Sequence, residues 1–408
     1  METFDHIIVG GGVIGASIAY HLTCKSAEKV LLLERNDFAS AASSQAAGLI
    51  LQGSSKPANT PLAKLTVDTI PLLEDELGES MGYHQVGSLR ITASDDRAAE
   101  LDAIALDASE RKIPVQWPST AEISAMVPWM DTSIVKKAAF LPTDGYVDPY
   151  LLTMFYIKAA RARGVVVRPR TEVKNVLVDK DEVVGVTTND GRIACGSVID
   201  ACGAWAAVFS ERVGFPLPMA PVRSHFWIAD AAELYRNEHP VTVLPDIAGY
   251  TRSDVGGLVL GLQEPHSATF DARELPDDPA TFSPTKGEEH WDILADAYED
   301  LMQFFPTIES AQFSSYVCGL SSYTPDGHII LGPVPSVSGF YAAAGTCGSG
   351  ITLSAGIGDA ITDLLLGRQP SIDIESFRPD RFGSIDPYCE PFRERCAAAR
   401  ALKSQKTV

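Results

Sequence analysis

The sequence predicts an α/β protein that opens with a Rossmann-type unit, in which a strand, a glycine turn, a helix and a second strand follow one another. An apolar, β-branched run at residues 7–9 has the composition of a buried strand. The motif GGGVIG at residues 10–15 follows directly, and the segment after it carries apolar residues at helical spacing. A second apolar run at residues 30–33 completes the unit, and the full length of 408 residues provides for two or more domains.

Each glycine of the motif has its own physical task. Gly10 permits a tight turn, Gly12 lets a pyrophosphate approach the backbone, and Gly15 lets the helix pack closely on the strand. The helix begins near Val13 and Ile14, where free N–H groups and the positive end of the helix dipole favour phosphate. These features predict a dinucleotide site.

The acid at the end of the second strand makes this prediction more specific. Glu34 follows the apolar run directly and is placed to accept hydrogen bonds from a ribose. A lone glycine motif is weak, but here strand, helix, second strand and acid all occur at the expected spacing. The alternative is a βαβ turn with only a structural role.

Composition narrows the class of protein. The net charge of −20 disfavours a grip on nucleic-acid backbones and suits a protein that repels its neighbours. No apolar run approaches the ~20 residues of a membrane span, and the predicted fold begins too early to leave room for a signal peptide, so we expect a cytoplasmic protein. The seven scattered cysteines include no C-x-x-C pair, and the eight histidines show no metal-site spacing, so we expect reduced thiols and no metal.

Further elements follow in order along the chain. A small-residue loop at residues 40–49 suits close approach to a ligand, although a flexible surface loop is the alternative. Ser119 and Glu122 form a capping box, Asp148 and Pro149 begin a helix, and Gly164 suits its end. The other expected helices cover residues 61–77, 98–111, 285–304 and 350–366, and the expected strands cover residues 88–92, 173–178, 183–188 (a hairpin with 173–178), 197–201, several within 221–263, 313–317 and 339–344.

Five ordered motifs resemble one family. GGGVIG with the following Glu34, DGYVDP, VIDACGAWA, CGLSSYTPDGHIILGPVP and GTCGSGI occur in this order between about residues 4 and 383. Together they resemble the flavoprotein amine oxidoreductases of the D-amino-acid oxidase superfamily, which includes glycine oxidase, sarcosine oxidase and the dimethylglycine and sarcosine dehydrogenases.

The resemblance implies FAD as cofactor and a Rossmann-type FAD-binding domain interleaved with a sheet-containing α+β substrate domain. The expected FAD-binding segments are residues 1–85, 145–220 and 315–385, the substrate domain takes residues 86–144 and 221–314, and residues 386–408 form a C-terminal tail. The basic part of that tail, residues 393–406, is expected to be either a docking element or a frayed end.

Carried over motif by motif, the resemblance assigns a set of FAD-binding residues. They are Gly10, Gly12, Val13, Ile14, Gly15, Glu34, Arg35, Ser43, Ser44, Gln45, Ala47, Gly48, Leu49, Val173, Gly203, Trp205, Gly319, Gly348, Ser349, Gly350, Ile351 and Thr352. Relatives that bind FAD covalently use a histidine where Gln45 stands, or a cysteine where Gly319 stands. Neither residue can form such a bond, so we expect non-covalent FAD, with Cys318 a packed thiol.

The substrate side departs from the family pattern. Ser321 and Thr352 stand where relatives carry an arginine or a lysine for the substrate carboxylate. Arg252, beside Tyr250, is then the expected replacement anchor, with an exposed strand cation as the alternative. The expected substrate-binding residues are Leu49, Tyr250, Arg252, Gln263 and Glu264, although an exposed glutamate is the commoner outcome at the last position.

The implied reaction is oxidation of an amine to an imine by hydride transfer to flavin N5, followed by hydrolysis. The wording SSYTPDG favours secondary amines such as N-methylated amines or amino acids. Val259 stands where an oxidase of the family has a lysine that assists oxygen, which slightly favours a dehydrogenase with another electron acceptor over an oxidase. One alternative is the flavin subunit of a heteromeric amine, opine or proline-type dehydrogenase, and another is a 2-hydroxy-acid dehydrogenase. A homo-oligomer and a complex with a partner subunit are both possible assemblies.

Overall fold

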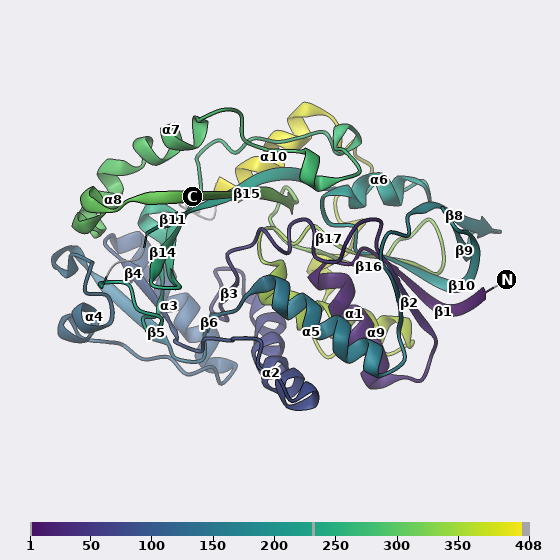
Figure 1. Ribbon diagram of the computed structural model, residues 1–408, viewed down its shortest axis with the longest axis horizontal. Helices are drawn as coiled ribbons and strands as arrows, with labels where there is room; N and C mark the ends of the chain where they lie inside the picture. Colours follow the sequence, from purple (N-terminus) through teal and green to yellow (C-terminus); the bar gives the residue numbers. More distant parts are fainter. Residues whose placement is uncertain (1, 231–232, 402–408) are drawn as a thin grey trace.

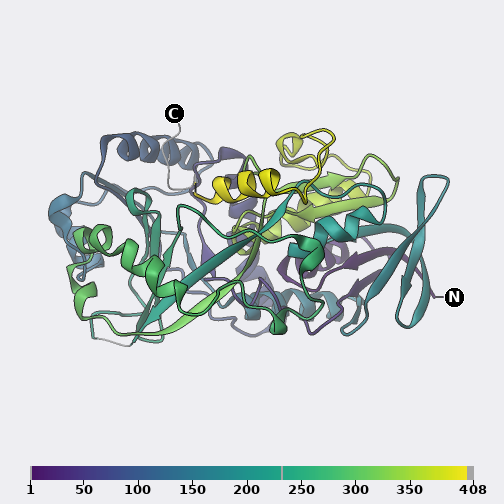
Figure 2. The ribbon, with the colours of Figure 1, turned by 90° about the horizontal axis from the view of Figure 1, so that it is seen from above.

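The computed structural model describes residues 2–230 and 233–401. Within this part, two large sheets stand side by side (Figure 1), and a small third sheet pairs β3 (Leu49–Ile50) with β6 (Gly145–Tyr146). The N-terminus lies at the outer end of the first sheet, and the described C-terminal helix lies near the middle of the molecule (Figure 2).

The first sheet contains the glycine turn. Its main path runs β16-β17-β10-β1-β2-β7, and β9 and β8 extend it from β10. Strands β17, β10, β1, β2 and β7 are parallel neighbours, as a Rossmann-type unit requires. The bounds are β1 Glu2–Val9, β2 Val30–Leu33, β7 Val166–Arg168, β8 Val173–Asp179, β9 Glu182–Thr188, β10 Gly191–Asp200, β16 Ile330–Pro333 and β17 Phe340–Ala344.

Helices cover both faces of this sheet. On one face, α1 (Val13–Lys25), α2 (Thr60–Leu77), α5 (Pro149–Ala162) and α9 (Gly350–Leu365) pack together over one apolar core. On the other face, α6 (Ala206–Glu211) and the β8–β9 hairpin enclose a second core. This burial on both faces explains why β2 is apolar at every position.

The second sheet belongs to the other half of the molecule. Its order is β15-β11-β14-β13-β12-β4-β5, and β11 and β15 pair over most of their length. The bounds are β4 Ser88–Thr92, β5 Lys137–Leu141, β11 Ala220–Ala229, β12 Val241–Leu244, β13 Gly249–Asp254, β14 Gly257–Leu262 and β15 Phe313–Tyr323, with α3 Asp95–Glu110, α4 Thr120–Met126, α7 Glu289–Asp296, α8 Tyr298–Phe304 and α10 Glu390–Ala401 as its helices.

Several local predictions are confirmed. Ser119 and Glu122 form the complete capping box of α4. Asp148 caps α5 by accepting hydrogen bonds from the N–H groups of its first turn, and Pro149 occupies the first helical position. The predicted hairpin is the β8–β9 pair.

Two predictions about the second half are wrong. The single helix expected at residues 285–304 is two short helices: Gly287, with a left-handed φ of 53°, precedes α7, and a turn at Ala297 separates α7 from α8. The strand expected to end at residue 317 continues to Tyr323 and pairs with β11 along its length. Residues 315–323 are therefore part of the second sheet rather than of the first.

The end of the described chain is also not a frayed tail. Residues 390–401 form α10, and Phe392 and Cys396, one helical turn apart, are fully buried against Val222 and Tyr323. This apolar stripe fixes the helix on β11 and β15. The last residues of the expected basic segment, 402–406, lie outside the described residues.

Candidate active site

The glycine turn between β1 and α1 has the geometry of a phosphate cradle. Gly10 has a φ of +112°, and a Cβ added to it would lie 2.3 Å from the carbonyl oxygen of Ala201. A Cβ on Gly15 would lie 2.0 Å from the carbonyl oxygen of Gly10, so only glycine allows this helix to pack so closely on the strand. Both glycines do what the motif predicts.

The cradle continues into the small-residue loop. The Ser43 hydroxyl accepts a hydrogen bond of 3.0 Å from the Val13 N–H at the start of α1. A Cβ on Gly12 would lie 3.0 Å from that same hydroxyl oxygen. Backbone and hydroxyl groups therefore meet here with almost no side-chain bulk, which leaves room for a phosphate at the helix N-terminus.

The Glu34 carboxylate lies at the end of β2, as predicted. It accepts hydrogen bonds from the N–H groups of Gly11 at 2.7 Å and Asn36 at 2.8 Å, which fix its orientation. Each carboxylate oxygen keeps a further lone pair, so the group can still accept from a hydroxyl. The neighbouring Arg35 lies over the Trp205 ring at 4.5 Å.

These features border one cavity of about 340 Å³, here called the first cavity. A cavity built of glycine backbone, a helix N-terminus and an acidic strand end fits the pyrophosphate and ribose of a dinucleotide. The predicted FAD-binding residues that line it are Gly10, Gly12, Val13, Ile14, Glu34, Arg35, Ser43, Gln45, Val173, Gly203, Trp205, Gly319, Gly348, Gly350 and Ile351.

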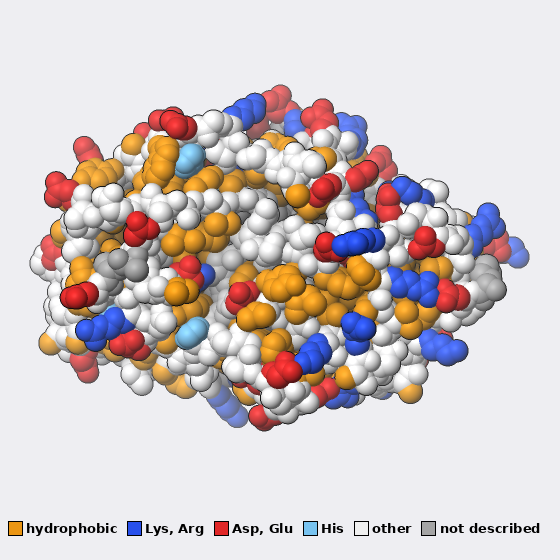
Figure 3. All heavy atoms as spheres, viewed as in Figure 1, with side chains coloured by type: hydrophobic (Ala, Val, Ile, Leu, Met, Phe, Trp, Pro, Cys, Tyr) orange, Lys and Arg blue, Asp and Glu red, His pale blue; other side chains and the backbone are white. Residues whose placement is uncertain are grey.

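A second cavity of about 320 Å³ adjoins the first. Part of the lining is common to both cavities and is here called the junction. It consists of Ala42, Gln45, Ala46, Gly319, Leu320, Ser321, Gly348 and Ile351. Gln45 and Gly319 are neighbours there, because a Cβ on Gly319 would lie 2.4 Å from Oε1 of Gln45. A hollow runs across the middle of the molecule, where hydrophobic side chains gather and charges are sparse (Figure 3).

The remaining predicted FAD-binding residues divide into two groups. Gly15 and Ser44 line neither cavity: Gly15 serves close packing, and the Ser44 hydroxyl donates to the Ala41 carbonyl within its own loop. The others line the second cavity only, and they are Ala47, Gly48, Leu49, Ser349 and Thr352. Of the predicted substrate residues, Leu49, Tyr250 and Gln263 line the second cavity as well.

Arg252 is not placed to anchor a substrate. Its side chain is buried, and its Nε donates to the Ala47 carbonyl at 2.6 Å. Its Nη1 pairs with Asp254 at 3.0 Å, and its guanidinium lies 5.0 Å from the centre of the Tyr146 ring. Arg252 lines neither cavity, and its partners show that it ties the second sheet to the small-residue loop.

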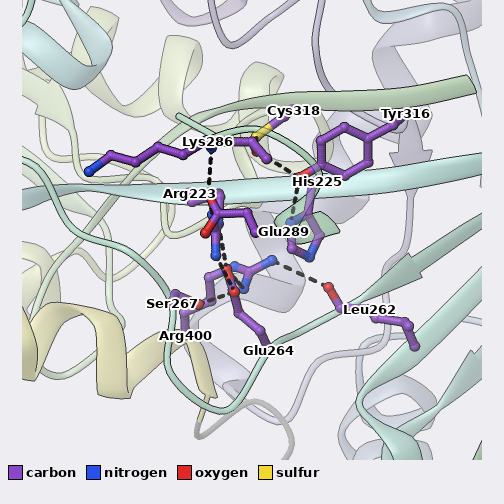
Figure 4. Close-up of polar contacts among 11 residues, drawn as sticks. Arg223, His225, Leu262, Glu264, Ser267, Lys286, Glu289, Tyr316, Cys318 and Arg400 are labelled. Carbon is purple, nitrogen blue, oxygen red and sulfur yellow. Dashed lines mark hydrogen bonds and ion pairs between the residues drawn. The ribbon is translucent and has the colours of Figure 1, made fainter. Parts of the chain in front are cut away.

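Glu264 also has a different role from the predicted one. Its carboxylate receives two hydrogen bonds from Arg223, at 3.0 and 2.6 Å, and both side chains are almost completely buried (Figure 4). The carboxylate lines neither cavity, and it is held by the bidentate pair rather than free for a substrate amine.

Several polar residues of the second cavity were missed from the sequence, among them Arg90, His225 and Arg400. Burial, with the nearby charges of Arg400 and Arg223, lowers the pKa of His225 to about 3, so its imidazole is neutral at physiological pH. Its Nδ1 lies 3.1 Å from the Tyr316 hydroxyl. A signal existed for Arg400, because it follows the buried Phe392 and Cys396 at the same four-residue spacing.

Among the described residues, no helix has the length and apolar content of a membrane span, and no cluster of three or more His, Cys, Asp or Glu side chains could hold a metal ion. A nucleotide cavity that shares part of its lining with a second cavity suits a dinucleotide-dependent oxidoreductase, because the reacting ring must reach the substrate.

Comparison with known proteins makes this class specific. The model of the family described as "FAD dependent oxidoreductase" (DAO) matches residues 5–364. The chain belongs to this family, and its cofactor is FAD.

Individual relatives agree with this assignment. A 4-methylaminobutanoate oxidase (formaldehyde-forming) of Paenarthrobacter nicotinovorans is 30% identical over 92% of this chain but only 45% of its own length, so the chain spans less than half of that relative. Glycine oxidase of Geobacillus kaustophilus is 28% identical over 92% of this chain and 96% of its own length. The solved structure of L-proline dehydrogenase from P. horikoshii shares the fold, with a TM-score of 0.83 at 23% identity over 93% of this chain and 98% of that one.

Proposed function

We propose that the protein oxidises an amine that carries a carboxylate, with secondary amines such as N-methylated amino acids preferred over primary amino acids. The observation that carries this proposal is the charge of the second cavity. Its lining holds three cations, Lys56, Arg90 and Arg400, against the single acid Glu100, although the whole chain has a net charge of −20. A cationic cavity in an acidic protein favours an anionic substrate.

The name of one relative supports an amine as the substrate. 4-Methylaminobutanoate, the substrate in the name of one relative, combines an N-methyl secondary amine with a carboxylate. In the proposed reaction, the substrate loses a hydride from the carbon next to nitrogen and a proton from nitrogen. The resulting imine takes up water to give a carbonyl compound and an amine. FAD, when bound, supplies the acceptor for the electron pair.

The residues of the chain bind and orient the substrate in this scheme. An amine that binds as the free base needs no protein base to remove its proton. The neutral His225 adds no positive charge to the cavity, so it does not repel a substrate that still carries its amine proton. The junction is where the substrate carbon and the cofactor ring would meet.

An anaerobic panel tests the proposal. The purified yellow protein is mixed without oxygen with N-methylated amino acids, primary amino acids, simple amines and 2-hydroxy acids, and loss of the flavin absorbance is followed. We expect amino acids with a secondary amine to bleach the flavin fastest, and amines without a carboxylate to act slowly. Bleaching by hydroxy acids alone would make the protein an alcohol-oxidising enzyme instead.

We also propose that FAD is held without a covalent bond. Gln45 and Gly319 carry no nucleophile, and Cys318 lines neither cavity and receives a hydrogen bond from Thr285 at 3.1 Å. Acid precipitation should release all of the flavin into the supernatant. Flavin that stays with the precipitate would contradict this proposal.

The electron acceptor is the subject of a separate proposal. We propose that the protein is a dehydrogenase that uses an acceptor other than oxygen, slightly favoured over an oxidase. It rests on Val259, which stands where an oxidase of the family has a lysine that assists oxygen and which brings no charge to that position. Val259 is fully buried and lines neither cavity. Substrate-reduced protein is mixed in a stopped-flow instrument with oxygen or with an artificial acceptor dye. Reoxidation by air as fast as turnover would make the protein an oxidase.

A further inference from the structure

The C-terminal helix α10 brings a buried arginine to the second cavity. Arg400 is only 3% exposed, and it lies beyond residues 5–364, the part of the chain that the family model matches. Phe392 and Cys396 hold the helix on β11 and β15, and Arg400 continues their row one turn further. The helix therefore contributes an apolar anchor and then a cation at the cavity wall.

The guanidinium of Arg400 is oriented by neutral groups. Nη1 donates to the Ser267 hydroxyl at 2.6 Å, and Nη2 makes a long contact of 3.4 Å with the Leu262 carbonyl (Figure 4). The Tyr323 hydroxyl is a further hydrogen-bond partner. An arginine side chain has five N–H donors, so these contacts fix its position without using all of them.

The charge of Arg400 has no close partner of its own among the described residues. The nearest carboxylate is that of Glu264, 3.9 Å away, and Glu264 is already held by the bidentate pair with Arg223. Glu289 also pairs with Arg223, at 2.8 Å, but its side chain is 38% exposed. The almost completely buried trio of Arg223, Arg400 and Glu264 thus carries one more positive than negative charge. Glu289 offsets this charge from a partly exposed position on the Arg223 side, so the Arg400 side remains favourable for an anion.

This charge acts on the cavity. Three residues that line the second cavity, His225, Tyr250 and Tyr323, have pKa values that burial shifts most and the charge of Arg400 second most. In each case the charge of Arg400 acts to lower the pKa, although burial raises the pKa of the two tyrosines overall. The side chain therefore makes the cavity attractive to negative charge.

We propose that Arg400 binds the substrate carboxylate, so that a C-terminal helix outside the family-matched residues supplies the anion-binding group. This proposal rests on the proposed function, because it assigns the carboxylate of the amino-acid substrate. It also explains how a carboxylate is bound although Ser321 and Thr352 are uncharged and Arg252 points elsewhere.

Arg90 is the rival, because it lines the same cavity and its Nε has no hydrogen-bond partner among the described residues. Two acids, Asp144 and Glu100, act on the Arg90 charge, and its Nη2 donates to the Gly53 carbonyl. Burial nevertheless outweighs both acids and lowers the pKa of Arg90. Arg400 is preferred because it is the strongest charge acting on three residues of the cavity lining, His225, Tyr250 and Tyr323.

The test compares an acid with its amide in the FAD-loaded protein. The best amino acid of the anaerobic panel and its carboxamide differ only in the carboxylate. Arg400→Gln should lower kcat/KM for the acid by about 30-fold or more, as for a buried charge pair that loses one partner. The amide should change by less than about threefold, and Arg400→Lys should fall between parent and Arg400→Gln, because it keeps the charge but not the fork.

Two controls and a binding readout complete the design. Arg395→Gln changes an exposed arginine of the same helix and should leave both substrates unaffected, and Arg90→Gln tests the rival. Binding of acetate and acetamide, followed by the change in flavin absorbance, reports on the anion site without turnover. FAD content and melting temperature show that each variant is folded.

The outcomes separate the two proposals. Equal losses for acid and amide in Arg400→Gln, or an acid-selective loss only in Arg90→Gln, would overturn the role of Arg400. A parent protein that oxidises no amine, yet prefers acetate to acetamide in a way that depends on Arg400, would overturn the proposed function and leave the anion site standing.

Discussion

The two cavities are built in different ways. The phosphate and ribose end of the first is formed mainly by backbone and small residues from short stretches, within residues 9–14 and 39–46. The second is formed by side chains from many separate elements, among them Arg90 of β4, His225 of β11, Tyr250 of β13 and Arg400 of α10. A site made of backbone can be recognised from local sequence, whereas a site made of distant side chains depends on the packing of the whole molecule.

The largest effect is expected where the second half depends on buried charge. Glu264→Gln removes the carboxylate of the bidentate pair with Arg223, which is also the carboxylate nearest to Arg400, so the free energy of unfolding should fall by about 3–5 kcal/mol. Urea denaturation measures it. Glu238→Gln, in an exposed ion pair of 3.8 Å with Arg236, is the control and should change stability by less than about 0.5 kcal/mol. Equal effects would show that burial of the pair does not matter.

The matching test of the first half is a single added methyl group. Gly10→Ala places a Cβ 2.3 Å from the Ala201 carbonyl oxygen, so we expect a loss of about 3 kcal/mol in stability and protein that is purified without most of its FAD. Gly164→Ala is the control, because Gly164 has a similar φ of +101° but no atom within 4 Å of its Cβ position. Equal losses in the two variants would show that backbone strain alone, and not the collision, is responsible.

The difference between the halves also explains which parts of the fold were predictable. The first βαβ unit, the capping box of α4 and the β8–β9 hairpin depend on neighbours in the sequence, and all were predicted. The prediction of a single helix at residues 285–304 was wrong because no glycine or proline marks the break at Ala297 in the sequence. The pairing of β15 with β11 joins residues about 100 positions apart, which no local pattern reports.

The substrate residues show the same limit. Tyr250 and Arg252 were both predicted to bind the substrate, but the sequence could not show that the long Arg252 side chain reaches the Ala47 carbonyl instead of the cavity. Glu264 was predicted to bind the substrate, with an exposed acid as the alternative, and only the approach of Arg223 and Arg400 makes it a buried partner. The segment with Arg400 was predicted to be a docking element or a frayed end. The helical spacing of Phe392, Cys396 and Arg400 could have marked the arginine as inward-facing, although nothing local indicated what it would face.

Replacing Arg252 should therefore affect the stability of the protein, whereas replacing Arg400 should affect recognition of the carboxylate. Arg252→Ala should lower stability by about 2 kcal/mol, because the Ala47 carbonyl and Asp254 lose their partner. The ratio of kcat/KM for acid and amide should stay that of the parent protein. An acid-selective loss in this variant would return the substrate carboxylate to Arg252 and contradict the assignment to Arg400.

The smallest effects come from two buried groups, one in each half, that respond to pH in opposite directions. His225 has its pKa lowered to about 3, mainly by burial and then by Arg400 and Arg223, so the unfolded chain takes up a proton that the folded protein does not. Its contribution to stability is complete above about pH 6.5 and is lost as the pH falls. Asp200 has its pKa raised to about 7 by burial, so its contribution is present at low pH and is lost as the pH rises from about 4 through 7.

Urea denaturation at pH 5 and pH 7 can separate these two groups. Replacing His225 by Asn removes a contribution that grows with pH, so the gain in stability from pH 5 to pH 7 should shrink by about 1–2 kcal/mol relative to the parent protein. Replacing Asp200 by Asn removes a contribution that declines over the same range, so the gain should increase by a similar amount. Shifts in the same direction would show that at least one of the two groups does not titrate as its burial requires, because the opposite signs follow only if the folded protein keeps the imidazole neutral and the carboxyl protonated.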